Sequence, residues 1–335
     1  MALSTSALGH RYIWGLKGDV RQNVAFHDEH TIVYVAGHTV VRYNTNEKRQ
    51  RFIPGTSGGD ASGDSEGISA LALCPSKRFV AVAERAERAF IVVYDLRTLR
   101  KRKNLAHAEA QCREYVSMAF STDWATLLAL GGAPTWNLAR WRWARGRVSA
   151  VVTANLANLE RPTLFECSLS PLDSSVAVAL STTTLAFYRV MDTEMRAMPQ
   201  PQVSLAEGSE LSCHCWLRQP EDHCVAGTSQ GELILYRSGD FVCFLACALP
   251  AGVGVSSLAA LSQGFVAGSA NGQFHLLMQE AEAGQVDELF ALAHVWSFDG
   301  AGAGNPGAGV VAAAAAGGAG GAGGGAPGSP GSAGA

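Results

Sequence analysis

The feature that most constrains this chain is a repeat of its own apolar pattern. Five times, a short apolar run ends in a bulky residue immediately before a Ser-Pro-like or polar turn. These residues are Phe26, Leu73, Phe120, Leu169 and Trp216, separated by 47, 47, 49 and 47 positions. A spacing this regular indicates that one small structural unit is repeated along the chain.

A second set of residues repeats in step with the first. Each unit has a third apolar run that closes on an aromatic residue, at Tyr43, Tyr94, Trp143, Tyr188 and Tyr236, with separations of 51, 49, 45 and 48. A weaker sixth copy runs from residue 256 to residue 278. The repeat therefore has an internal order as well as a period.

Each unit is composed of short strands. Runs of about 4–7 residues rich in Val, Ile, Leu, Phe and Tyr alternate with turns of Gly, Pro, Asn, Asp and Ser. Two turns, 228–231 and 269–272, end in Gly, which tolerates the positive φ of tight hairpins. A fourth run follows the closing aromatic, as at 50–53, 148–152, 241–245 and 289–295. Four antiparallel strands per unit of this length predict β-propeller blades.

Other repeat architectures fit less well. Helical repeats need apolar residues at i, i+3, i+4 and i+7, whereas 80–82 and 91–94 have the continuous apolar character of buried strands. A β-sandwich has no need of two sets of spacings in step. The sequence therefore predicts an all-β, WD40-like β-propeller.

The propeller is expected to occupy residues 1–297. Six units of four antiparallel strands are visible, at 20–53, 68–105, 115–152, 164–203, 211–249 and 256–295. Residues 10–16 resemble the lone outer strand of a seventh, incomplete blade. Residues 298–335 are rich in Gly and Ala, so we expect a disordered low-complexity tail there.

Composition excludes several classes of function. The chain of 335 residues is 47% hydrophobic and carries a net charge of −3, so it can bury a core and has no strong field for nucleic acid or acidic membranes. The longest apolar stretch, 241–255, is shorter than a membrane span and contains Pro250, Gly252 and Gly254. Eight scattered cysteines without an apolar leader favour a reducing compartment.

Four short motifs imitate chemical sites. Residues 302–307 spell G-x-G-x-x-G, but no acidic residue follows about 20 positions later to bind a ribose. Residues 55–59 spell G-x-S-x-G, but polar loop follows rather than a helix. The cluster 27–30, His-Asp-Glu-His, falls at a hairpin turn, where polar residues are ordinary.

The fourth motif gathers soft metal ligands. Cys213, His214 and Cys215 precede His223 and Cys224 by a few residues. On a strand, Cys213 and Cys215 point one way and His214 points the other way, and the spacing is not that of common zinc sites. We therefore predict no catalytic, cofactor-binding or metal-binding residues and no cofactor.

Basic residues gather near the turns between third and fourth strands. They occur at 97–103, at 48–51, and at Arg140, Arg142, Arg145 and Arg147. If the blades are alike, these turns share one rim and form a basic band for an acidic partner such as tubulin tails. The alternative is a solvated edge protected by charge. Trp124, Trp136 and Trp141 are either binding anchors or packing residues.

Four stretches resemble the N-terminal propeller of the cilia- and flagella-associated protein 57 family, which are WD-repeat proteins of the axoneme. The stretches are 48–54, 100–103, 116–121 and 137–143, and the similarity extends over about residues 10–295. The resemblance implies a non-enzymatic scaffold on ciliary doublet microtubules that binds axonemal proteins and helps place inner dynein arms. Two features depart from it: the seventh blade, second propeller and coiled coil are missing, and Tyr94-Asp95 is the nearest approach to the usual Trp-Asp blade ending.

Two alternatives to an axonemal scaffold remain open. The first is a cytoplasmic WD-repeat adaptor that recruits substrates or cargo through a propeller face. The second is a propeller enzyme, which needs acidic and histidine residues converging on the central channel. The starts of the innermost strands are apolar and small, which disfavours the enzyme.

Overall fold

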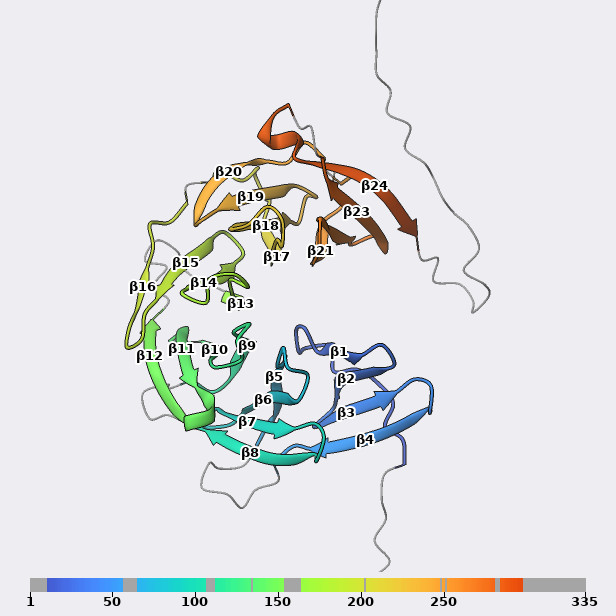
Figure 1. Cartoon of the computed structure of the whole chain (residues 1–335), viewed down its shortest axis with the longest axis vertical. Coiled ribbons are helices and arrows are strands. Elements are labelled where there is room, and N and C mark those ends of the chain that lie inside the picture. The colour runs from blue at the N-terminus through green and yellow to red at the C-terminus, as the bar shows by residue number, and fades with distance from the viewer. Residues whose placement is uncertain are drawn as a thin grey trace, which may run out of the picture.

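The computed structural model describes residues 11–56, 65–106, 112–133, 135–153, 164–201, 203–247, 249–250, 252–280 and 284–297. Within them, six four-stranded antiparallel sheets are arranged around a common axis (Figure 1). The WD40-like propeller with six visible blades is therefore confirmed. The tail at 298–335 and the motif at 302–307 lie outside the described residues.

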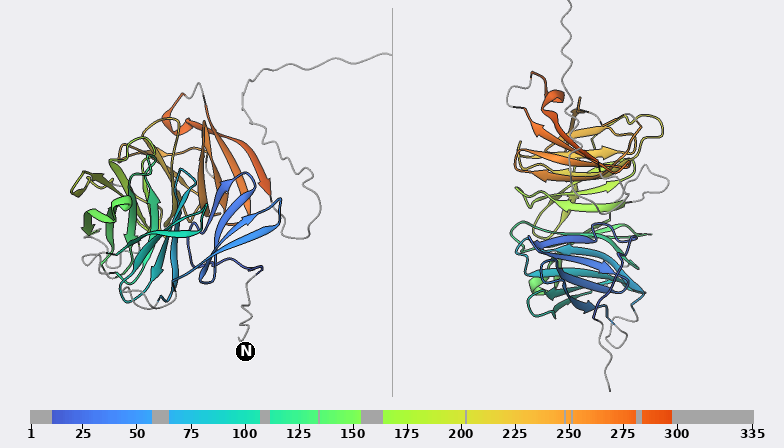
Figure 2. Two further views of the ribbon diagram at one scale, coloured as in Figure 1. Left: turned by 60° about the horizontal axis from the view of Figure 1, so that its bottom comes forward. Right: turned by 90° about the vertical axis from the view of Figure 1, so that its right-hand side faces the viewer.

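The sheets are called blades 1 to 6 in chain order, and each is a simple meander whose first strand lies nearest the axis (Figures 1 and 2). The strands of blades 1 to 3 are β1 (Val24–Asp28), β2 (Thr31–Ala36), β3 (Thr39–Asn44), β4 (Arg49–Pro54), β5 (Gly67–Leu73), β6 (Phe79–Arg85), β7 (Phe90–Asp95), β8 (Arg100–Leu105), β9 (Tyr115–Phe120), β10 (Leu127–Gly131), β11 (Asn137–Arg142) and β12 (Arg147–Thr153). The strands of blades 4 to 6 are β13 (Leu164–Leu169), β14 (Val176–Ser181), β15 (Leu185–Val190), β16 (Met195–Ala197), β17 (Leu211–Trp216), β18 (His223–Thr228), β19 (Leu233–Arg237), β20 (Asp240–Phe244), β21 (Val255–Leu261), β22 (Gly264–Ser269), β23 (Gln273–Gln279) and β24 (Phe290–Ser297). Two short 3-10 turns, η1 (Trp143–Arg145) and η2 (Val286–Glu288), join third and fourth strands.

The repeated residues mark the same places in successive blades. Leu73, Phe120, Leu169 and Trp216 each end the first strand of a blade, and Phe26 lies two residues before the end of β1. The closing aromatics lie within two residues of the ends of third strands, with Trp143 one residue beyond β11. Both sets of spacings therefore measured the distance from one blade to the next.

Side chains wedge between neighbouring blades. In β6, alternate residues such as Ala81 and Ala83 face blade 3, while Val80 and Val82 face blade 1. Because both faces are covered, the strand sequence is continuously apolar rather than alternating. Five buried clusters of this kind join blades 1 to 6 in succession.

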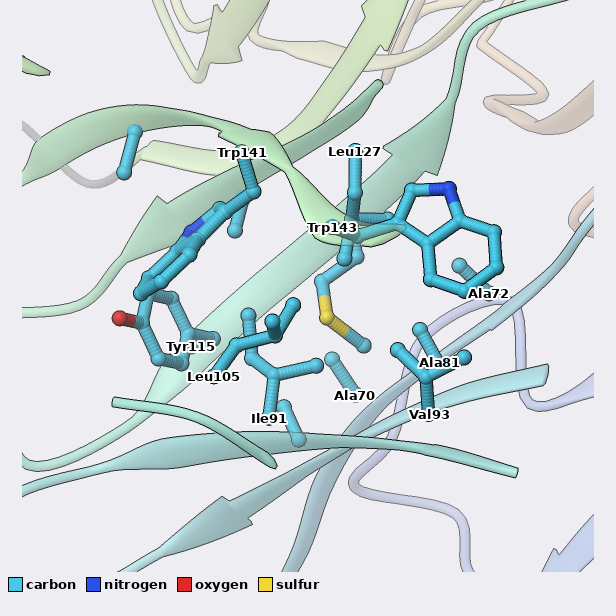
Figure 3. Close-up of a cluster of buried hydrophobic side chains, with 14 of the residues drawn as sticks. Ala70, Ala72, Ala81, Ile91, Val93, Leu105, Tyr115, Leu127, Trp141 and Trp143 are labelled. Atoms are coloured by element: carbon cyan, nitrogen blue, oxygen red, sulfur yellow. The ribbon is translucent and has the colours of Figure 1, made fainter. Parts of the chain in front are cut away.

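The core between blades 2 and 3 shows how the wedge is formed (Figure 3). Near the axis the strands supply small residues such as Ala70 and Ala81, and farther out they supply Trp141 and Trp143. Radiating blades diverge away from the axis, so the space to be filled grows outward. Small residues inside and aromatic residues outside therefore fill this space at the density of a protein interior.

Hydroxyl side chains hold the turns between second and third strands. In blade 4 the Ser181 hydroxyl accepts the Thr184 N–H at 2.9 Å, and in blade 5 that of Thr228 accepts the Glu232 N–H at 3.0 Å. The predicted turns at 228–231 and 269–272 are confirmed, with φ of +94° at Gly231 and +81° at Gly272. Such side-chain bonds satisfy backbone groups that the ladder leaves unpaired.

One expectation needs correction. The lone outer strand expected at 10–16 is not assigned as a strand over its described residues, although residues 11–17 run beside β4, where the Gln50 side chain bonds both the N–H and the C=O of Ile13. The basic run 97–103 lies at and just after the turn between β7 and β8, as expected, and its residues from Arg100 onward form β8, the outermost strand of blade 2. Charged residues can form β8 because an edge strand needs a partner on one side only.

Asp95, the residue nearest to a Trp-Asp blade ending, organises the turn after β7. Its carboxylate accepts the Arg97 N–H at 2.9 Å, the Thr98 N–H at 3.2 Å and Nε of Arg78 at 3.1 Å. Burial tends to raise the pKa of Asp95, but these donors outweigh burial and lower it. A lowered pKa in the folded state stabilises the fold above pH 4 and ceases to do so as pH falls through that pKa.

We expect Asp95→Ala to lower the free energy of unfolding by about 1–2 kcal/mol at pH 7. The difference from the wild type should shrink below about pH 4, because the protonated wild-type carboxyl no longer gains from its donors. Urea unfolding at a series of pH values measures this. A difference that is constant down to pH 2 would contradict it.

Candidate protein-interaction surface

The outer strands of blades 1 to 3, with the turns that lead into them, form a cationic surface. Residues 45–54, 96–105 and 143–153 contain ten basic residues and one acidic residue, Glu47. In β8, the four consecutive residues Arg100, Lys101, Arg102 and Lys103 are all exposed. The positive charge therefore stays in solvent at the outer edge of the ring, where a partner can reach it.

The turns between third and fourth strands lie on one rim, because all six blades are the same meander. The predicted shared rim is thus consistent with the topology. On blade 4 this turn carries Asp192 and Glu194, and on blade 6 it carries Asp287 and Glu288. Acidic residues therefore lie at the turns of blades 4 and 6, whereas the turns and outer strands of blades 1 to 3 together are basic, and this asymmetry orients an approaching charged partner.

An open pocket of about 360 Å³ lies at this rim between blades 3 and 4. Three arginines line it, together with Asp123 and Ser174. Arg140 donates to the carbonyl of Met191 at 2.9 Å, and Arg142 donates to Asp192 at 2.9 Å. Arg145 is exposed on the 3-10 turn η1.

Electrostatics make this pocket suited to an anionic group. Burial lowers the pKa of Arg140, and the nearby Arg142 lowers it further. The carboxylate of Asp123 accepts a hydrogen bond from the Ser121 hydroxyl, which lowers the pKa of Asp123. A carboxylate from a partner would relieve the repulsion between the arginines and can form bidentate bonds with a guanidinium.

The three tryptophans considered as anchors have different places. Trp124 is 49% exposed at the turn between β9 and β10, beside the arginine pocket. Its carbonyl accepts the indole N–H of Trp143 at 2.7 Å, which fixes its backbone. Trp136 is half-buried against the core of blades 3 and 4, and Trp141 is fully buried. Of the three, Trp124 alone is placed to meet a partner.

The structure places the described residues of the short motifs in strands, turns and loops of the blades. On β17, Cys213 and Cys215 pack toward blade 6 while His214 points toward blade 4, as predicted from strand alternation. Residues 27–30 lie at the turn between β1 and β2, as expected. Of the motif at 55–59, only Gly55 and Thr56 are described, and Thr56 donates from its N–H and its hydroxyl to buried Glu84. Among the described residues, no group of three His, Cys, Asp or Glu side chains is placed to hold a metal ion.

One polar cluster was missed by the sequence reasoning. Glu166 and Ser168 of β13 face His214 of β17, between the innermost strands of blades 4 and 5. Ser168 Oγ lies 2.6 Å from Nε2 of His214, whose Nδ1 lies 3.6 Å from Glu166. The signal was present in the sequence, since Glu166 and His214 are polar residues on apolar inner strands one repeat apart.

The cluster is buried and hydrogen-bonded to neighbouring side chains. The hydroxyl of Ser168 also accepts the indole N–H of Trp216 at 2.9 Å, and the Gln22 side chain donates to Glu166. His214 and Glu166 are both less than 10% exposed. These bonds join two blades to each other and to the segment before β1, and of the His214 ring nitrogens only Nε2 has a hydrogen-bond partner.

All eight cysteines are free thiols, and five of them are buried. Burial raises the pKa of Cys167 and of Cys213 to about 12, and that of Cys112 to about 11. The thiolate is the reactive species, so these thiols should be inert in the folded protein. Half-buried Cys243 has a pKa that burial raises less.

We expect a thiol reagent at pH 8 to modify Cys243 first, and Cys167 and Cys213 at least about a hundredfold more slowly until the protein unfolds. Mass spectrometry of timed samples gives the rate at each site. The variant Cys243→Ser should remove the fast phase. Fast modification of Cys167 in the native protein would show that the core between blades 3 and 4 opens readily.

Comparison with known proteins gives the family. No protein-family model matches the chain. Mouse "Cilia- and flagella-associated protein 57" is 32% identical to it over 241 residues, which is 71% of this chain. This chain belongs to the cilia- and flagella-associated protein 57 family. The resemblance stated from four stretches of sequence is thus confirmed.

Two further matches define the extent of the likeness. "Cilia- and flagella-associated protein 57 C" of Tetrahymena thermophila is 28% identical over 222 residues, 63% of this chain. A crystal structure of RRP9 WD40 repeats superposes with a TM-score of 0.60 at 13% identity, covering 83% of this chain and 81% of that one, and it supports the fold alone. The chain spans 18% of the mouse relative and 16% of the Tetrahymena relative. No helix among the described residues is both long and apolar enough to cross a bilayer.

Proposed function

We propose that this member of the cilia- and flagella-associated protein 57 family is a structural scaffold of the ciliary or flagellar axoneme. Its blades form a rigid frame, and its cationic surface binds acidic protein segments, such as tubulin tails. Through such contacts it helps place inner dynein arms on doublet microtubules. The observation that carries the proposal is the excess of basic residues on blades 1 to 3, in a chain whose net charge is −3.

The mechanism is binding rather than chemistry. Exposed Arg100, Arg102 and Lys103 attract an acidic segment over a distance of about 8 Å, the screening length at physiological salt. The arginine pocket then orients a carboxylate, and Trp124 supplies apolar contact area. The rigid blades lose little conformational freedom on binding, which favours affinity.

The convergent Ser168, His214 and Glu166 do not alter this proposal. A nucleophilic serine needs a free path to a substrate and a base oriented by its carboxylate. Here Ser168 accepts the Trp216 indole N–H, and the distance of 3.6 Å from His214 to Glu166 is too long for a good hydrogen bond. We infer that the cluster fastens blade 4 to blade 5 and that the protein is not an enzyme.

A tagged copy in a ciliated cell tests the scaffold against the cytoplasmic adaptor. We expect the tagged protein to concentrate in cilia and to stay with the axoneme after detergent removes the membrane. A signal that remains in the cytosol and is unchanged when cilia are lost would favour the adaptor and overturn the scaffold.

A further inference from the structure

Two arginines occupy a position that is apolar in other blades. Arg42 of β3 and Arg140 of β11 each precede the aromatic residue of their strand that lies in register, across the second strand, with Phe26 or Phe120 of the first strand. In blades 2, 4 and 5 the same position holds a fully buried residue that packs against the following blade, namely Val93, Phe187 and Leu235. Blades 1 and 3 therefore place a guanidinium group where these blades place core side chains.

Both arginines reach toward the following blade but are incompletely paired. Nη1 of Arg42 donates to the carbonyl of Leu96 at 3.4 Å, and Nη1 of Arg140 donates to that of Met191 at 2.9 Å. Each acceptor directly follows the third strand of the next blade. The Nε group of each arginine is buried and has no hydrogen-bond partner among the described residues. Burying a polar group in this way costs free energy that an apolar residue would avoid, so packing alone does not explain the two arginines.

Each arginine lines an open pocket at the rim that carries the turns between third and fourth strands. The arginine pocket of blade 3 contains Arg140, and a pocket of about 300 Å³ on blade 1 contains Arg42. The residues that line this second pocket, here called the blade 1 pocket, are Thr31, Arg42, Asn44, Glu47, Arg49 and Arg51. Thr31 begins β2, and its counterpart in the arginine pocket is Thr126, directly before β10. The two pockets therefore lie at the same place in two repeats.

The blade 1 pocket holds positive charge that the described residues do not neutralise. Arg42 and Arg51 lie directly opposite each other on β3 and β4. Like charges at such positions repel each other and destabilise the strand pair. No ion pair among the described residues includes Arg42, Arg49 or Arg51, although Glu47 also lines the pocket. An anionic group from a partner would therefore relieve the repulsion.

Blade 4 shows how this protein satisfies a similar pair of arginines. Arg189 and Arg196 lie directly opposite each other on β15 and β16. Arg189 pairs with Asp173 at 3.2 Å, and Arg196 pairs with Glu194 at 2.8 Å. A carboxylate is thus the group that completes such a site on blade 4, and it matches the planar guanidinium in shape and charge.

We propose that the blade 1 pocket is a second carboxylate-binding site, and that it and the arginine pocket of blade 3 hold two carboxylate groups of one acidic protein segment. This inference rests on the proposed function, because it states where such a segment is held. Blade 2 lies between the two pockets (Figure 1), and its turn after β7 exposes Arg97 to the crossing segment. Once one carboxylate is bound, the other binds intramolecularly, which raises the affinity without any new contact.

Binding of synthetic peptides to the full chain at physiological salt tests the proposal. One peptide carries a single block of glutamates, and a series of others carries two such blocks joined by Gly-Ser linkers of increasing length. We expect the best two-block peptide to bind at least about tenfold more tightly than the single-block peptide. Arg42→Leu and Arg140→Leu should each remove this gain while weakening single-block binding by no more than about twofold. The matched control is Arg237→Leu, which changes an exposed arginine at the end of the third strand of blade 5 and should leave the gain intact.

Thermal unfolding of the same variants separates binding from packing. Arg42→Leu and Arg140→Leu should unfold at the wild-type temperature or above it, because blade 5 already places a leucine, Leu235, at this position. A large fall in unfolding temperature for both variants would assign the arginines to packing between blades and overturn the proposal.

Two further results would overturn the inference alone. One is equal affinity for the single-block and two-block peptides at every linker length, and the other is a gain that survives Arg42→Leu. In both cases acidic peptides still bind, so the proposed function stands. A wild-type protein that binds neither kind of peptide would overturn the inference together with the proposed binding of acidic segments.

Discussion

Trp141→Ala should lower the free energy of unfolding by about 3–5 kcal/mol, the range for deleting a large aromatic side chain from a packed core. The indole of Trp141 is fully buried between blades 2 and 3, where it fills the wide outer part of the wedge (Figure 3). Its neighbours, such as Tyr115 and Leu105, are held in their own strands and cannot move in to fill the cavity. Denaturant unfolding followed by circular dichroism measures the loss.

Trp124→Ala is the matched control for this prediction. Trp124 is 49% exposed, so the same substitution should change stability by less than about 0.5 kcal/mol. It should instead weaken partner binding at the arginine pocket. Equal losses of stability in the two variants would contradict the assignment of Trp141 to the core and Trp124 to the surface.

Gly264→Ala should destabilise the fold by about 3 kcal/mol or more, because it combines backbone strain with a steric clash. Gly264 opens β22 with φ of +142°, and a Cβ there would lie 2.1 Å from the carbonyl oxygen of Leu277 in the neighbouring strand. Because that oxygen belongs to the backbone, the clash can be relieved only if β22 and β23 of blade 6 move apart.

The variant Gly208→Ala tests the cost of backbone strain without a steric clash. Gly208 has φ of +75°, but no atom lies within 4 Å of the position that a Cβ would take there, so we expect a loss of only about 1 kcal/mol. Thermal unfolding of both variants checks the difference. Similar losses at both sites would mean that the close approach at Gly264 is relieved without cost.

Periodicity predicted the fold because every blade buries the same positions. Leu169 and Trp216, for example, end the first strands of two successive blades. Because each blade packs against its neighbours in the same way, apolar residues recur at the same positions of each repeat. The same physics explains why the continuous apolar runs were correctly assigned to strands buried on both faces. Blade 4 was the least predictable, because its fourth strand, β16, is only three residues long and two of these residues are exposed.

The structural positions of the charged and polar residues were harder to predict from sequence than those of the apolar strands. The run 97–103 has poor strand propensity, and the placement of its residues from Arg100 onward in β8 depends on hydrogen bonds to β7 rather than on side chains. The cluster of Glu166, Ser168 and His214 is assembled by two blades, so its members are separated by about one repeat and no local motif marks them. Which of Trp124 and Trp141 is exposed likewise depends on the tertiary packing of blade 3 against blade 2.

Cosedimentation with demembranated axonemes tests the central claim most directly. The double variant Arg100→Glu/Arg102→Glu reverses charge on β8, and Arg88→Glu/Arg113→Glu reverses two exposed residues outside the cationic surface. We predict that the wild type and the control pellet with axonemes, that rising salt releases them, and that the β8 variant binds at least about tenfold more weakly. A wild-type protein that stays in the supernatant, or a β8 variant that pellets as well as the control, would contradict a scaffold that binds through its basic surface.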